Sequence, residues 1–165
     1  MSPVFWIPIG IPGSLGIMPR PTGGDRLADE VMIWRTQGVH RIISALEAFE
    51  QTQLDLEEEG ALCEAVGIAF DAFPIPDRSV PDSEQAADRF IGQIAAAVLN
   101  GQRIAVHCRM GIGRSGLLTA STLVALGCDP SEAFLRVSVA RGVDVPDTRE
   151  QYEWVQRFAV RIRST

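Results

Sequence analysis

The sequence contains no lysine, and all 15 of its basic residues are arginine. This absence excludes Schiff-base chemistry on a lysine amine and the lysine-dependent Walker loop that binds nucleotides. Any phosphate that the protein binds must therefore be held by arginine side chains and backbone N–H groups. Acidic residues outnumber basic ones, and the resulting net charge of −6 argues against nucleic-acid partners and anionic membrane surfaces.

Cysteine is also scarce. The chain has three cysteines, Cys63, Cys108 and Cys128, and no Cys-x-x-Cys pair, so the sequence predicts neither a disulfide framework nor a metal site. The apolar stretch at residues 4–18 is interrupted by prolines and glycines, and no basic residue precedes Arg20. This stretch fits neither a signal peptide nor a membrane span. We therefore expect a reducing, cytoplasmic compartment, with Cys63 and Cys128 as small core residues.

The 165 residues suffice for one domain, and no repeat, low-complexity tract or long linker divides residues 1–165. Short apolar runs that predict strands alternate with periodic runs that predict helices. Strands are expected at residues 4–7, 15–18, 41–46, 68–73 and 103–107, and helices after 25, from 57, from 82, at 114–126, from 130 and from 147. The alternation predicts an α/β fold, a mainly parallel central sheet flanked by helices on both faces.

Three helix starts rest on particular side chains. Asp25 is expected to cap the first helix, and Asp82 with Gln85 has the spacing of a capping box. The acidic run at residues 57–59 places carboxylates at the amino end of another helix, where the helix dipole favours them. We expect this run to form a solvated face.

The most informative segment, residues 104–116, joins a short apolar strand to a helix through a glycine-rich turn. In such a turn successive N–H groups point inward as an anion-binding nest, and the helix amino terminus adds positive potential. The guanidinium of Arg114 can donate two parallel bonds to phosphate oxygens. The residues expected to bind phosphate are Arg109, Met110, Gly111, Ile112, Gly113 and Arg114.

Cys108 lies at the mouth of this nest, where the same N–H groups favour the thiolate and lower the pKa of the thiol. A thiolate beneath a bound phosphoryl group is placed for in-line attack, which yields a cysteinyl-phosphate. Arg114 and the nest would then stabilise the transition state. In this hypothesis Ser115 donates a hydrogen bond to the sulfur; otherwise it is an ordinary first-turn serine. The alternative for Cys108 is a small buried cysteine before a helix.

Two further residues complete the candidate site. The leaving oxygen needs a proton, and Asp77 lies in a proline-bounded loop between a strand and a helix, residues 74–81. A turn aspartate after proline is an equally good interpretation of that position from the residues alone. His107 precedes the nucleophile on a strand and should point away from it, so we expect its side chain to bond the loop backbone and fix its shape.

The segment from His107 to Ser115 resembles the signature loop of the protein tyrosine phosphatase superfamily, particularly its dual-specificity branch. That pattern is His-Cys-x5-Arg followed by Ser or Thr. Residues 73–82 are similar to the general-acid loop of the cyclin-dependent kinase-associated phosphatase and related small bacterial phosphatases, and this resemblance implies that Asp77 is the acid. The Thr148-x-x-Gln151 segment is similar to one that related enzymes place near the catalytic water, which implies a water-positioning role for Gln151.

The resemblance implies a cysteine-dependent phosphatase with no cofactor, acting on phosphotyrosine, phosphoserine, phosphothreonine or aryl phosphate esters. The chain's single tyrosine, Tyr152, lies downstream of the loop, and the loop interior holds one basic residue, Arg109. Both features favour a shallow pocket and a phosphoprotein or small aryl phosphate over a polyanionic lipid. Two alternatives remain: rhodanese-like sulfur transfer, since such loops also begin Cys-Arg-x-Gly, and a catalytically weak phospho-binding module.

Overall fold

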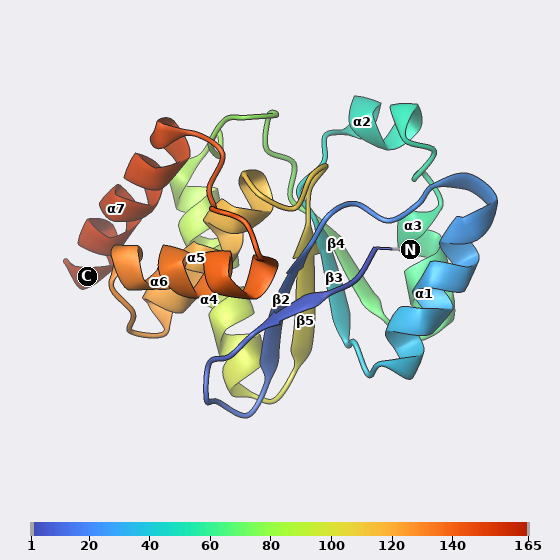
Figure 1. Ribbon diagram of the computed structural model, residues 1–165, viewed down its shortest axis with the longest axis horizontal. Helices are drawn as coiled ribbons and strands as arrows, with labels where there is room; N and C mark the ends of the chain where they lie inside the picture. The colour runs from blue at the N-terminus through green and yellow to red at the C-terminus, as the bar shows by residue number, and fades with distance from the viewer. Residues whose placement is uncertain (1, 165) are drawn as a thin grey trace.

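The computed structural model describes residues 2–164 and is built on a five-stranded sheet with strand order β1-β2-β5-β3-β4 (Figure 1). β1 pairs with β2 antiparallel, and the remaining neighbours are parallel. The strands are β1 (Phe5–Ile7), β2 (Ser14–Met18), β3 (Arg41–Ser44), β4 (Ala69–Ala72) and β5 (Arg103–His107). The carboxyl ends of the four parallel strands therefore meet at one edge of the sheet.

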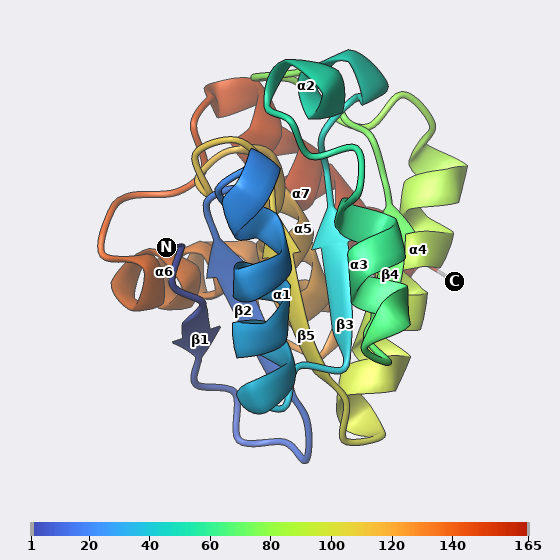
Figure 2. The ribbon, with the colours of Figure 1, turned by 90° about the vertical axis from the view of Figure 1, so that its right-hand side faces the viewer.

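Apolar side chains alternate between the two faces of the sheet, as a strand covered on both sides requires. Ile43, Ile104 and Val106 belong to one core cluster, whereas Ile42 and Ala105 belong to the other. The first cluster lies against α4 (Glu84–Leu99), α5 (Arg114–Ala125), α6 (Pro130–Arg141) and α7 (Arg149–Arg163), and the second against α1 (Leu27–Thr36) and α3 (Glu59–Ala65) (Figure 2). The predicted α/β fold, with helices on both faces, is confirmed.

Two predicted helix starts are wrong in detail. The hydroxyl of Ser83, not the carboxylate of Asp82, caps α4 by accepting the Ala86 N–H at 3.1 Å. Asp25 lies inside a 3-10 turn, η1 (Gly24–Arg26), and α1 begins beyond it without a side-chain cap. Serine and aspartate are both good helix caps, so local spacing alone does not separate Asp82 from Ser83, and helix boundaries predicted from sequence are uncertain by one or two residues.

One short helix was not expected from the sequence: α2 (Ala48–Gln53) follows β3 directly and stands over the carboxyl edge of the sheet (Figure 1). Glu50 in its first turn accepts the backbone N–H of Glu47 at 2.9 Å. The side chain of Glu50 is nevertheless buried, because it points inward toward the loop after β5. None of the helices within residues 2–164 is both long and apolar enough to cross a bilayer.

Candidate active site

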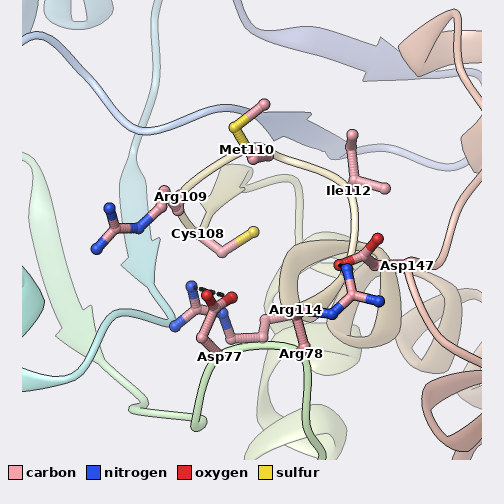
Figure 3. Close-up of a pocket in the computed structure, with 9 residues that line it drawn as sticks. Asp77, Arg78, Cys108, Arg109, Met110, Ile112, Arg114 and Asp147 are labelled. Carbon is pink, nitrogen blue, oxygen red and sulfur yellow. Dashed lines mark hydrogen bonds and ion pairs between the residues drawn. The ribbon is translucent and has the colours of Figure 1, made fainter.

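The loop between β5 and α5, residues 108–113, wraps around the sulfur of Cys108 (Figure 3). Gly111 has a φ of 71°, and a Cβ atom there would lie 2.5 Å from the carbonyl carbon of Met18 and the nitrogen of Pro19. Glycine is therefore required on both grounds, backbone angle and close approach. A Cβ on Gly113 would lie 2.9 Å from the Cβ of Asp147, so this turn also leaves no room for a side chain.

Cys108 is 3% exposed, and its Sγ lies 3.1 Å from the Oγ of Ser115. Burial by itself raises the pKa of this thiol, but the Ser115 hydroxyl, the N–H groups of Ser115 and Ile112, and the charge of Arg114 oppose it. The balance lowers the pKa below that of an ordinary thiol. The N–H groups of Ser115 and Ile112 therefore face the sulfur, and the phosphate-binding nest of the whole loop stays a prediction.

The lowered pKa of Cys108 leads to a prediction for Ser115. Ser115→Ala removes the hydroxyl that favours the thiolate, so we expect the pKa of Cys108 to rise toward the usual value of about 8.5. The rate at which iodoacetamide alkylates the Cys108 peptide, measured against pH, should therefore have its midpoint at higher pH in the variant. Ser121→Ala, a buried serine in the same helix, is the matched control. An unchanged midpoint in Ser115→Ala would contradict the assignment.

Arg114 begins α5, and its side chain is 2% exposed. Its NH1 donates to Glu50 Oε2 at 2.6 Å and to the carbonyl of Ile75 at 3.0 Å, and its NH2 donates to Glu50 Oε1 at 2.9 Å. A fourth bond joins NH2 to Asp77 Oδ1 at 3.0 Å. Burial alone raises the pKa of Glu50, but the bonds from Arg114 outweigh it and keep the carboxylate charged. Glu50, which the sequence did not indicate as a site residue, thus fixes the orientation of the Arg114 guanidinium by accepting bonds from both of its terminal nitrogens.

Asp77 and its neighbour Arg78 lie across the pocket from the loop (Figure 3). The cavity has a volume of about 280 Å³. Its lining residues are Asp77, Arg78, Cys108, Arg109, Met110, Ile112, Gly113, Arg114 and Asp147. Arg78 NH1 contacts Asp147 Oδ2 at 2.6 Å, so an exposed ion pair joins the loop after β4 to the segment before α7. The structure therefore brings Asp77 to the same cavity as Cys108 and Arg114.

His107 points away from the pocket, as expected, and is fully buried. Its Nε2 lies 2.7 Å from Oε1 of Glu59, and its Nδ1 lies 3.2 Å from the carbonyl oxygen of Cys108. Burial alone lowers the pKa of His107, but the Glu59 carboxylate reverses this and raises it. The raised pKa favours the protonated ring, in which Nε2–H can donate to Glu59 and Nδ1–H to the carbonyl of Cys108. Glu59 is 1% exposed, so the expectation that residues 57–59 form a solvated face is wrong for its last member.

Gln151 is buried, and its amide lies against Gly113. Its Oε1 accepts the N–H groups of Asp147 and Thr148, both at 3.1 Å, and its Nε2 donates to the carbonyl of Ser79 at 3.0 Å. These bonds connect the start of α7 to the loop that carries Asp77. The water-positioning role of Gln151 stays a prediction.

Among the other loop side chains, that of Ile112 packs against the first core cluster. Arg109 lies toward Gln53 and Glu50, at 3.4 and 3.5 Å, and Met110 is 62% exposed. Arg109 and Met110 can therefore contribute their backbone N–H groups, not their side chains, to phosphate binding at the centre of the loop.

The other two cysteines have raised pKa values. Burial raises the pKa of Cys63 to about 12, and it also raises the pKa of Cys128. Cys108 is the one cysteine of the three whose thiolate is favoured.

Comparison with known proteins assigns the class. A family model described as "Polymorphic toxin system, DSP-PTPase phosphatase" matches residues 17–128. The chain therefore belongs to the dual-specificity branch of the protein tyrosine phosphatase superfamily, whose members are phosphoric monoester hydrolases, and the resemblance noted in the sequence is confirmed.

Individual relatives agree with this class. Cyclin-dependent kinase inhibitor 3 of Rattus norvegicus is 29% identical over 99 residues, 59% of this chain and 46% of the rat protein. This chain thus spans about half the length of that relative. Among solved structures, kinase associated phosphatase, crystallised with its catalytic-site cysteine changed to serine, has a TM-score of 0.88 at 19% sequence identity. The superposition covers 99% of this chain and 97% of the kinase associated phosphatase chain. PTPMT1 in complex with PI(5)P has a TM-score of 0.75 at 19% identity, and the superposition covers 91% of this chain and 92% of the PTPMT1 chain.

Proposed function

We propose that the protein hydrolyses phosphate monoesters through a cysteinyl-phosphate intermediate formed on Cys108. The observation that carries this proposal is the position of the Cys108 sulfur, which lies beside the Ser115 hydroxyl and the N–H groups of Ser115 and Ile112, in the same cavity as Arg114 and Asp77. A binding module needs the anion nest and the arginine, but it needs neither a low-pKa thiol nor a carboxyl group directed into the same cavity. The catalytic-site cysteine of kinase associated phosphatase supports the same interpretation.

Arg114 is oriented to bind the phosphoryl group. A guanidinium carries five N–H groups, and the bonds to Glu50, Ile75 and Asp77 use four of them. Nε–H is the fifth. When phosphate enters, Nε–H and the N–H that now bonds Asp77 can donate in parallel to two phosphate oxygens. Exchange of the Asp77 bond for phosphate would release that carboxyl group toward the ester oxygen.

The first chemical step forms a sulfur–phosphorus bond as the phosphorus–oxygen ester bond breaks. The electron pair of the broken bond stays on the leaving oxygen, which takes a proton from Asp77. Negative charge on the three equatorial oxygens is stabilised by the loop N–H groups and Arg114, whose charge is held in place by Glu50.

The second step hydrolyses the intermediate. Water attacks phosphorus, the sulfur–phosphorus bond breaks, and its electron pair returns to Cys108, while the Asp77 carboxylate accepts a proton from the water. Ser115 Oγ, 3.1 Å from the sulfur, donates to the departing thiolate and makes it a better leaving group. Gln151 lies beside Gly113 and would help to hold the water there.

We further propose a phosphoprotein or an aryl phosphate as substrate. No aromatic side chain lies among the residues that line the cavity within the described chain, and Tyr152 instead stacks on Phe134 with ring centroids 4.9 Å apart. Such a pocket admits short serine and threonine esters as well as tyrosine esters. The rim arginines, Arg78 and Arg109, are each paired with a carboxylate, so little unpaired positive charge is available to a polyanionic lipid.

The test is hydrolysis of para-nitrophenyl phosphate by freshly reduced protein in EDTA, with rapid denaturation and mass spectrometry of the Cys108 peptide. We expect metal-independent turnover and a phosphoryl group on Cys108 during the reaction. Phosphotyrosyl and phosphoseryl peptides should then be cleaved in preference to PI(5)P in micelles. Absence of turnover by folded, reduced protein would overturn the proposal and direct the next assay to thiosulfate as a sulfur donor.

A further inference from the structure

Four successive carbonyl oxygens of the Cys108 loop accept hydrogen bonds from groups outside the loop. The carbonyl of Cys108 bonds the ring of His107, and that of Arg109 accepts the backbone N–H of Arg20 at 3.1 Å. The next two carbonyls, of Met110 and Gly111, both accept from the side chain of Arg141, each at 3.0 Å. The four carbonyls are thereby held away from the sulfur.

Arg141 is the last residue of α6, which ends because Gly142 adopts a left-handed conformation with a φ of 84°. A basic residue in the last helical turn is ordinary, since it complements the helix dipole. The guanidinium of Arg141 instead leaves its own helix. It lies 4.8 Å from the ring centroid of Phe5 and donates from Nε to Gly111 and from NH2 to Met110. One rigid, planar group therefore holds two adjacent peptide units.

The direction of a carbonyl sets the direction of the N–H in the same peptide unit, because the unit is planar and trans. The carbonyl of Gly111 shares its peptide unit with the N–H of Ile112, which is one of the groups that lower the pKa of Cys108. The carbonyl of Met110 likewise shares its unit with the N–H of Gly111. Glycine tolerates either sign of φ, so Gly111 offers little intrinsic resistance to rotation of these two units. Arg141 supplies the missing restraint.

We infer that Arg141 is a positioning residue for catalysis: by holding the Met110 and Gly111 carbonyls, it keeps the Gly111 and Ile112 N–H groups directed at the thiolate and the phosphoryl oxygens. This inference rests on the proposed function for its effect on turnover. Its effects on the thiol and on oxyanion binding need no turnover.

The experiment compares Arg141→Met and Arg141→Lys with the natural protein and with Arg136→Met, a control on the same helix whose side chain pairs with Glu132 on the surface. Two readouts are independent of hydrolysis: the pH midpoint of Cys108 alkylation and the affinity for tungstate. In Arg141→Met we expect the midpoint to rise and tungstate to bind about tenfold more weakly. The kcat should fall about ten- to a hundredfold, less than the ~100- to 1,000-fold that follows outright loss of an oxyanion donor.

Arg141→Lys keeps the charge but not the planar fork, so we expect losses between those of Arg141→Met and the natural protein. If Arg141→Met changes only the melting temperature, with midpoint and tungstate affinity as in the natural protein, the inference is overturned. Equal losses in Arg136→Met overturn it as well. If the natural protein binds tungstate and has a low-pKa Cys108 but hydrolyses nothing, the proposed function fails, and the two other readouts still decide the role of Arg141.

Discussion

Cys108→Ser is expected to abolish hydrolysis of para-nitrophenyl phosphate, by about 10⁴- to 10⁶-fold in kcat, the scale seen when a catalytic nucleophile is removed. The physical reason is ionisation. The Ser115 hydroxyl, the N–H groups of Ser115 and Ile112, and the charge of Arg114 together lower the pKa of the Cys108 thiol despite its burial and so favour the thiolate. A serine hydroxyl begins from a far higher pKa, so the same surroundings leave it protonated and weakly nucleophilic.

Oxyanion binding should survive the Cys108→Ser change, because the loop backbone, Arg114 and Glu50 remain in place. We expect tungstate to bind at least as tightly as in the natural protein, since one negative charge has been removed from the nest. Cys128→Ser, at a half-buried cysteine remote from the loop, is the control and should retain full activity. Appreciable turnover by Cys108→Ser would require a different nucleophile and would refute the cysteinyl-phosphate mechanism.

Asp77→Asn should produce the second largest loss, and its size should depend on the leaving group. A phosphoserine ester leaves as a basic alkoxide, so we expect its hydrolysis to slow by about 100- to 10,000-fold without a proton donor. Para-nitrophenolate leaves readily without protonation, and its release should slow much less. Asparagine keeps the size of the side chain and an oxygen that can accept the Arg114 bond. The difference in slowing between the two substrates therefore measures the loss of proton donation by Asp77.

The measurement is kcat for a phosphoseryl peptide and for para-nitrophenyl phosphate, in Asp77→Asn and in Asp82→Asn. Asp82 is exposed and lies in the same connection between β4 and α4, so its variant should behave like the natural protein. If the two substrates slow equally in Asp77→Asn, the side chain contributes to binding or loop shape, and the general acid has to be sought at another pocket residue, beginning with Asp147.

The parts of the site that lie close together in the chain could be predicted from the sequence. The strand, the glycine turn and the helix that hold Cys108, Arg114 and Ser115 are contiguous, so their spacing alone indicated the geometry. Asp77 was favoured only once the resemblance to a known family was added. The turn after β3 was not predicted as a helix, since α2 has six residues and too few turns to show an apolar period.

Glu50, Glu59 and Arg141 were missed for a different reason. Each contacts the site across at least 30 residues of chain: Glu50 reaches Arg114, Glu59 reaches His107, and Arg141 reaches Gly111. A buried arginine indicates that some carboxylate must neutralise it, but the sequence offers 21 acidic residues without a local pattern that selects one. Only the fold makes that choice.

The bond between Glu50 and Arg114 also limits how this protein can be redesigned. Connections at the rim of a sheet ordinarily tolerate insertion and exchange, and α2 looks like such a connection. The rotation of α2 about its axis is instead fixed by the buried contact of Glu50 with Arg114. One added or deleted residue before Glu50 would rotate its side chain by about 100° around the helix and leave Arg114 without its carboxylate. An engineer who wishes to reshape the pocket entrance should therefore keep the length of α2 unchanged and vary exposed side chains between β4 and α4, leaving Ile75, Asp77 and Ser79 in place.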